Sequence, residues 1–156
     1  MLCAIGLWRA REETLIKSLM HIKYMNKNFN GVIIEESIEK KDVLEKVKIL
    51  KTKVEEVTPE HNTPYLKQWT LHTVEIFENQ ADEIAEELSE SLDFSHGDWY
   101  ADFKNDDFHF IIFRNKVFKI DRSKPEQYKK AVEYGLSLGV PDYQLDFKPD
   151  IKEWKR

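Results

Sequence analysis

Cysteine, glycine and long apolar runs are all scarce in this sequence of 156 residues. The single cysteine, Cys3, excludes a disulfide within the chain and is typical of a reducing compartment, so we predict a cytoplasmic location. The longest apolar run, Met1–Trp8, is too short to span a membrane. It also lacks the basic start and the small-residue cleavage site of a secretory signal. We therefore expect no membrane partner.

The common signatures of catalysis and cofactor binding are also missing. With only five glycines, a backbone cradle for phosphate is hard to build. The sequence contains no glycine-rich nucleotide turn, no HExxH and no paired CxxC. Cys3 has no obvious base near it, and no Gly-x-Ser-x-Gly elbow occurs. We predict no cofactor and no metal site.

The composition is that of one globular domain with a well-solvated surface, 41% hydrophobic and 34% charged. The charge is uneven, because residues 1–30 carry a net +3 and the remainder carries a net −8. An acidic body argues against general affinity for nucleic acid. A nucleic-acid accessory protein is therefore our third alternative. It would use a local basic patch of Lys104, Arg114, Lys116, Lys119 and Arg122.

The segment Arg9–Met25 has apolar residues at helical spacing and predicts an amphipathic helix. One interpretation is a basic helix that binds a partner or a membrane surface. Two others are a helix docked on the core and an extension ahead of a start at Met25. We favour these two, because amphipathic helices mostly face a core. Residues 1–30 are thus treated as a helical extension, 31–147 as a single domain and 148–156 as a tail.

The domain alternates strand and helix patterns. Strands are predicted from apolar and aromatic alternation at Gly31–Glu35, Val47–Val57, Trp69–Glu78, Asp98–Lys104, Asp107–Arg114 and Lys116–Asp121. A helix is predicted at Ala81–Leu92 with Asn79 as its cap, and a second follows a capping box at Ser123–Glu126 and stops at Gly139. A helical turn at Asp42–Lys46 and a short strand or extended arm at Asp142–Phe147 complete the pattern.

This order predicts an α+β fold with a mainly antiparallel sheet of five to six strands, plus an N-terminal helix. Its two main helices are expected on one face of the sheet, as in a ferredoxin-like or related sandwich. The strand Asp107–Arg114 is apolar on both sides, which is typical of a strand covered on both faces.

Four strings in the domain resemble a group of small bacterial and archaeal proteins. They are Trp69–His72 (WTLH), Trp99–Phe103 (WYADF), Phe118–Asp121 (FKID) and Leu138–Phe147 (LGVPDYQLDF). The strings span most of the chain beyond its first 24 residues. The resemblance implies one compact domain. The group carries no assigned activity, so it supplies no catalytic residues.

Histidines and acids on the predicted strands are the candidates for chemistry. His72, Asp102 and His109 lie on three of these strands and could form an acid–base or metal-assisted centre if the strands were neighbours. Their spacing follows no ligand rule, so we favour satisfied sheet histidines and a solvent-facing Asp102. A small enzyme built on this cluster is our second function hypothesis.

Aromatic residues support the first hypothesis, a non-catalytic module that binds a small molecule or a protein, or associates with itself. Trp69, Trp99 and Tyr100 could line a binding surface, with Asp102 and His109 beside them. The competing interpretation is packing within the core, because aromatics are core formers first. An apolar cleft at Trp99 and Tyr100 would favour binding. Converging His and Asp side chains in that cleft would favour catalysis.

Overall fold

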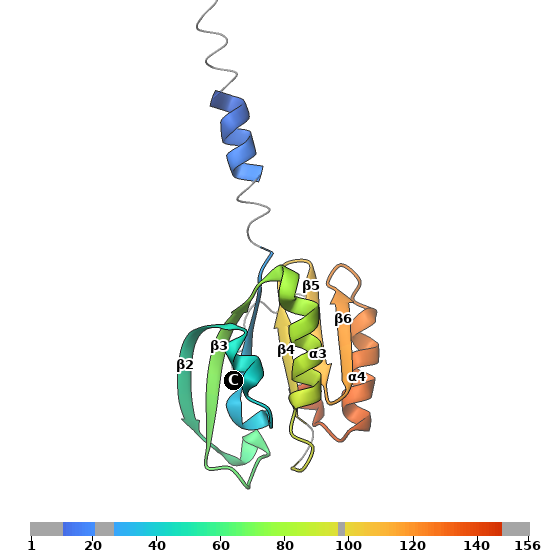
Figure 1. The fold of residues 1–156 in the computed structure, drawn as a ribbon. Helices are drawn as coiled ribbons and strands as arrows, with labels where there is room; N and C mark the ends of the chain where they lie inside the picture. Colours follow the sequence, from blue (N-terminus) through green and yellow to red (C-terminus); the bar gives the residue numbers. More distant parts are fainter. Residues whose placement is uncertain (1–10, 21–26, 97–98, 148–156) are drawn as a thin grey trace, which may run out of the picture.

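The computed structural model describes residues 11–20, 27–96 and 99–147. Six strands form one sheet in the order β2-β3-β1-β4-β5-β6, and every neighbouring pair is antiparallel (Figure 1). The strands are β1 (Phe29–Ile34), β2 (Lys48–Glu56), β3 (Gln68–Ile76), β4 (Tyr100–Lys104), β5 (Phe108–Phe113) and β6 (Lys116–Asp121). The predicted α+β class with an antiparallel sheet is confirmed.

Short helical segments connect these strands. The α-helices of the domain are α2 (Asp42–Glu45), α3 (Ala81–Ser91) and α4 (Gln127–Ser137). Single 3-10 turns are η1 (Glu35–Ser37), η2 (Pro59–His61), η3 (Glu78–Gln80) and η4 (Asp142–Gln144). The segment Asp142–Phe147, expected to be a strand or an extended arm, thus contains a helical turn instead.

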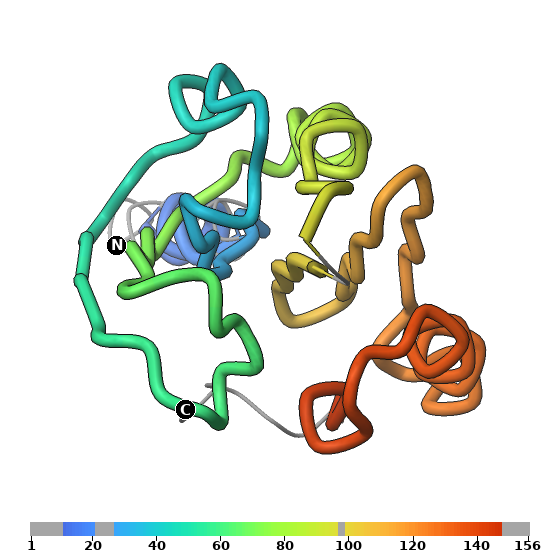
Figure 2. Tube along the Cα trace, turned by 90° about the horizontal axis from the view of Figure 1, so that it is seen from below, coloured from blue at the N-terminus to red at the C-terminus, as the bar shows by residue number. Residues whose placement is uncertain are grey.

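The two main helices cover opposite faces of the sheet, which differs from the expected placement on one face (Figure 2). We call these sides the α3 face and the α4 face. Strand β5 contributes side chains to both faces, because successive side chains of a strand point to opposite sides. Phe110 and Ile112 pack in the core under α3, and Ile111 and Phe113 pack in the core under α4. Coverage on both sides, expected from the apolar pattern of this strand, is confirmed.

Each face has its own apolar core. On the α3 face, Ile84, Ala85 and Leu88 of α3 pack against the sheet together with α2. On the α4 face, Tyr128 and Ala131 of α4 pack against β5 and β6. The segment after α4 closes this second core with Val140, Leu145 and Phe147, all buried.

Both predicted helix caps are wrong, although α3 begins at Ala81 as predicted. Helix α4 begins at Gln127 with no side-chain cap, because the Ser123 hydroxyl donates to Asp121 Oδ1 at 2.6 Å instead. Helix α3 follows Gln80, and Asn79 lies within η3. The predicted stop is confirmed, since Gly139 has φ 89° just after α4, a backbone conformation that favours glycine.

Residues 11–20 form the N-terminal helix expected from the sequence, and all ten are exposed. Its apolar residues Leu15, Ile16, Leu19 and Met20 are each more than half exposed. Among the described residues this helix therefore buries no apolar stripe against the domain, in contrast to the docked interpretation. Residues 1–10 and 21–26 of the expected extension and the tail 148–156 lie outside the described residues. Strand β1 begins at Phe29, slightly before the expected domain boundary.

Strands β1 and β4 approach each other closely at Gly31. A Cβ atom at this position would lie 2.4 Å from the backbone oxygen of Asp102 and 2.8 Å from Phe103 Cβ. Gly31 pairs directly with Phe103 in the antiparallel register. The contact brings the first half of the sheet against the aromatic meander β4–β6.

Candidate functional site

A pocket of about 170 Å³ lies where the ends of several segments meet. Six rings line it, those of His61, Tyr65, Trp69, His96, Trp99 and Tyr100. The remaining described lining residues are Ile34, Asn62, Thr63, Pro141 and Gln144. The pocket therefore contains Trp69, Trp99 and Tyr100, the three aromatic residues that the sequence predicted for binding. The rings of His61, Tyr65 and His96 were not predicted for this role.

The two tryptophans reach this pocket from different strands. Trp69 is on the side of β3 opposite to His72, and it is 5% exposed. Trp99 directly precedes β4, and its ring centroid lies 5.6 Å from that of Trp69. The Trp69 indole N–H donates to Thr63 Oγ1 at 3.0 Å, and His61 meets the Trp69 ring edge-on at 4.3 Å. Trp69 is thereby fixed in position from two sides.

A stacked pair of rings forms another part of the lining. Tyr65 stacks on His96 with centroids 4.7 Å apart and an interplanar angle of 27°. His96 Nδ1 in turn lies 3.1 Å from Asp93 Oδ2. Burial raises the pKa of the Tyr65 hydroxyl, and the neighbouring Trp99 indole partly offsets this rise. The hydroxyl is thus held in its neutral form.

Tyr100 joins the pocket to the segment after α4. Its hydroxyl donates to the backbone oxygen of Gln144 at 2.5 Å. Its ring also meets Phe147 edge-on at 5.4 Å. The turn η4, which supplies Gln144 to the lining, is anchored in this way to the first residue of β4. Part of the pocket wall therefore depends on tertiary contacts of the segment after α4.

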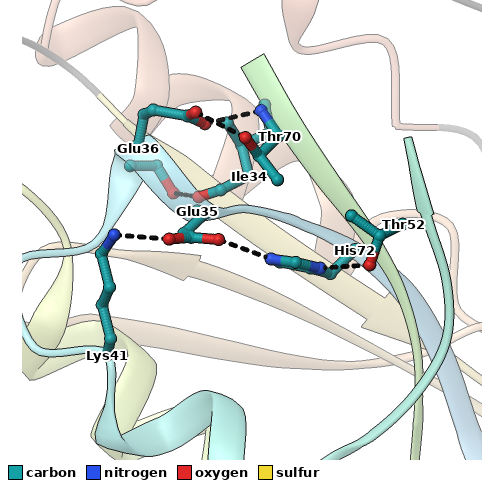
Figure 3. A network of polar contacts seen from close by, with 8 residues as sticks. Ile34, Glu35, Glu36, Lys41, Thr52, Thr70 and His72 are labelled. Atoms are coloured by element: carbon teal, nitrogen blue, oxygen red, sulfur yellow. Dashed lines mark hydrogen bonds and ion pairs between the residues drawn. The ribbon is translucent and has the colours of Figure 1, made fainter. Parts of the chain in front are cut away.

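On the α3 face, His72 is the centre of a polar network (Figure 3). His72 Nε2 lies 2.9 Å from Glu35 Oε2, and His72 Nδ1 lies 2.9 Å from the Thr52 hydroxyl. The other oxygen of Glu35 accepts a hydrogen bond from Lys41. The hydrogen bond from Lys41, followed by that from His72, lowers the pKa of Glu35. This side chain is therefore an anion that orients the imidazole.

The next residue of η1 extends the same network. Glu36 accepts hydrogen bonds from the Thr70 backbone N–H at 2.7 Å and the Thr70 hydroxyl at 2.8 Å. Figure 3 shows Glu35 and Glu36 reaching neighbouring positions of β3. The two carboxylates attach η1 to β3 on the α3 face of the sheet. The network thus has a clear structural role.

Asp102 and His109 form a second buried polar cluster, on the α4 face. His109 is 1% exposed, and its Nε2 lies 2.9 Å from Asp102 Oδ2. Its Nδ1 lies 3.1 Å from the Tyr128 hydroxyl of α4. Burial raises the pKa of Tyr128, and nearby Arg122 opposes this effect. Lys104 belongs to the same face, and burial lowers its pKa.

The three candidate residues for acid–base chemistry do not converge. Asp102 and His109 meet within hydrogen-bond reach, whereas His72 lies on the other face of the sheet with Glu35 and Thr52 as partners. The expected solvent-facing Asp102 is also wrong, since its side chain is only 14% exposed. Neither His72 nor His109 is among the described residues that line the pocket.

The five residues of the predicted basic patch are also divided between the two faces. Lys119 lies 3.0 Å from Asp82 of α3, and Arg114 lies 3.6 Å from Glu39. Lys116 and Lys104 are on the α4 face, by their pairing with Phe113 and His109. The described residues thus offer no single surface that all five basic side chains share.

Sequence reasoning missed most partners of these sites. His61 and Tyr65 lie in a proline-bounded loop that carried no ring pattern, and His96 was assigned to a turn. The one usable signal was Thr58-Pro-Glu-His61, because a side chain three residues after Thr can complete a capping box. Glu35 and Thr52 are distant from His72 in the sequence and follow no spacing rule.

Within the described ranges, no group of three or more His, Cys, Asp or Glu side chains could hold a metal ion. No helix in the described part of the chain is long and apolar enough to cross a membrane. Comparisons with protein-family models, curated proteins and solved structures give no match. The functional argument therefore rests on the geometry of the chain alone.

Proposed function

We propose that this chain is a ligand-binding module whose aromatic pocket holds a small molecule with a planar ring. The single observation that carries the proposal is the lining, which has six rings and no Asp, Glu, Lys or Arg among its described residues. Ligand pockets are typically apolar and aromatic, with a few polar groups that fix orientation. The lining of this pocket combines aromatic rings with the polar side chains of Asn62, Thr63 and Gln144.

The volume of the pocket suits a ligand of this size. An engineered apolar cavity of about 150 Å³ binds benzene, so a space of about 170 Å³ has room for one ring with a small substituent. Trp69 is held by Thr63 and His61, and Tyr100 is held by Gln144. A ligand would therefore meet rings that are already oriented, which reduces the entropy lost on binding.

Catalysis is less well supported by the same geometry. A general acid or base has to reach the reacting group directly or through one water. Asp102 and His109 are buried between β4, β5 and α4, and His72 is on the opposite face. The binding hypothesis requires only the stacking rings, which the pocket brings together.

Binding of phenol, followed by ligand-observed NMR, tests this function. Trp99→Ala removes one wall of the pocket and is expected to weaken phenol binding about tenfold or more, because stacking on one aromatic ring contributes on the order of 1–3 kcal/mol. Phe94→Ala is the matched control, since Phe94 is 77% exposed and is not part of the lining. Equal phenol affinity of the wild type, Trp99→Ala and Phe94→Ala would contradict the proposal.

A further inference from the structure

The carboxylate of Glu35, the imidazole of His72 and the hydroxyl of Thr52 contact one another in sequence on the α3 face (Figure 3). The distances from His72 Nε2 to Glu35 Oε2 and from His72 Nδ1 to Thr52 Oγ1 are both 2.9 Å. The hydrogen bonds from Lys41 and His72 lower the pKa of Glu35, so this carboxylate is an anion that can only accept. A neutral His72 therefore carries its proton on Nε2, and its Nδ1 accepts from the Thr52 hydroxyl. A base that faces a hydroxyl and is oriented by a third group is the arrangement that activates an oxygen nucleophile.

The hydroxyl of this arrangement belongs to an exposed residue. Strand β2 is at the edge of the sheet, and Thr52 is one of its exposed residues, whereas His72 behind it is 7% exposed. Asp102, His109 and Tyr128 repeat the same order of carboxylate, imidazole and hydroxyl, but there Tyr128 is 4% exposed. A reagent from solution can therefore approach Thr52, whereas Tyr128 is enclosed in the core.

From this geometry we propose that Thr52 is a nucleophile that accepts a short acyl group from a thioester or another activated ester. With a thioester, Thr52 Oγ1 attacks the acyl carbon, so a C–O bond forms and the C–S bond breaks. The hydroxyl proton passes to His72 Nδ1 and then to the departing thiolate, and Glu35 stabilises the imidazolium in between. The products are an ester on Thr52 and a free thiol, and no redox partner is required. None of the three residues lines the aromatic pocket, so this site is separate from the proposed ligand site.

Two neighbouring side chains suit this role. Lys41 donates to the other carboxylate oxygen of Glu35, which fixes the carboxylate against the imidazole. Val54 is two residues along β2 from Thr52, in the part of the strand with regular pairing, so the two side chains lie on the same side. Val54 is 57% exposed and offers an apolar contact next to the hydroxyl. This contact favours an acyl group with a short hydrocarbon chain.

Incubation of the full chain with S-ethyl thioacetate, followed by mass spectrometry of its peptides, tests the proposal. The probe contains no ring, so it tests this site independently of the aromatic pocket. Ser123 is the internal control, because its exposed hydroxyl donates to Asp121 Oδ1 and contacts no imidazole among the described residues. We expect acetylation of Thr52 to be about a hundredfold faster than that of Ser123, because a positioned base contributes on the order of 10²–10⁴ in rate.

Three variants separate base catalysis from simple exposure of the hydroxyl. Thr52→Ser keeps the hydroxyl and should still be acetylated at this position. His72→Gln and Glu35→Gln should each lower the rate at residue 52 relative to Ser123 at least about tenfold. A purely structural effect would loosen β2 and expose Thr52 further, which would not lower this ratio.

Thermal melts establish which variants are folded, and Glu35→Gln decides the same point if His72→Gln does not fold. The proposal is wrong if Thr52 in the wild type is acetylated no faster than Ser123. It is also wrong if the folded His72→Gln variant, or Glu35→Gln in its place, keeps the wild-type rate ratio. Neither result affects ligand binding by the aromatic pocket, which phenol tests separately.

Discussion

His109 Nε2 and Asp102 Oδ2 lie 2.9 Å apart across the β4–β5 pair, with the imidazole 1% exposed. His109 also contacts the Tyr128 hydroxyl of α4 at 3.1 Å. The imidazole therefore joins the sheet to α4 through polar contacts inside an otherwise apolar core. This position makes it a structural residue with a measurable contribution to folding.

His109→Ala is expected to lower the free energy of unfolding by about 2–4 kcal/mol, because it creates a cavity and removes the imidazole from a buried carboxylate. Tyr128→Phe removes one hydroxyl contact and should cost about 0.5–1.5 kcal/mol. Urea unfolding of both variants measures the difference. A loss for His109→Ala no larger than that for Tyr128→Phe would show that the contact to Asp102 contributes little.

Acid should weaken the contact between η1 and β3. The hydrogen bond from Lys41, followed by that from His72, lowers the pKa of Glu35 below its ordinary value of 4.5. A carboxyl with a depressed folded-state pKa contributes stability that is fully present above the unfolded value and is lost as the pH falls through the folded value. The Glu35 contribution should therefore decrease as the pH falls below about 4.5.

The difference in unfolding free energy between the wild type and Glu35→Gln measures this effect. We expect the difference to shrink between about pH 5 and about pH 3, because only the wild type has the carboxylate to titrate. Lys41→Met removes the main cause of the pKa shift, so the same comparison in that background should vary less with pH. A difference that stays constant over this range would contradict the prediction.

Gly31→Ala should be strongly destabilising, because its Cβ would lie 2.4 Å from a backbone oxygen of β4. We expect a loss of at least about 2 kcal/mol in chemical unfolding, as for overpacked cores. Gly135→Ala is a useful comparison, since its Cβ would meet chiefly the side-chain end of Leu145 at 2.7 Å. Leu145 is buried, but a side chain shifts more easily than a strand backbone and alanine favours the helix, so the loss should be smaller than that of Gly31→Ala. The reverse order would refute the close approach of β1 and β4.

Removing the N-terminal segment should leave the domain intact. All residues from 11 to 20 are exposed, so a chain that starts at Met25 loses no buried apolar contact of this helix. We expect its free energy of unfolding to match that of the full chain within about 0.5 kcal/mol. Thermal and urea unfolding of the two chains provide the comparison. A loss above about 1 kcal/mol would indicate that the segment packs on the domain in solution.

The strands were predictable because their apolar and aromatic residues alternate with the period of a pleated sheet. The sequence of β5 even indicated that both of its faces are covered, through Phe110 and Ile112 on one side and Ile111 and Phe113 on the other. The side on which each helix packs was not predictable. An apolar stripe shows that a helix buries one face, but it carries no information about which face of the sheet receives it.

The pocket was predictable only in part. Trp99 and Tyr100 adjoin a strong strand signal, so a local aromatic cluster indicated them. Tyr65 and His96 come together through a contact between two loops, and no short-range pattern encodes that contact. The predictions of the helix caps were wrong for a related reason. The Ser123 hydroxyl could donate to a neighbouring carboxylate as well as cap α4, and Asp121 is the partner it takes.

The alternation of β5 has an evolutionary consequence. Phe110 and Ile112 belong to the core under α3, and Ile111 and Phe113 belong to the core under α4. Adjacent positions of one strand therefore experience independent packing constraints, whereas positions two apart share one. In diverged sequences of this fold, substitutions at the even-numbered positions should co-vary with α3 and those at the odd-numbered positions with α4.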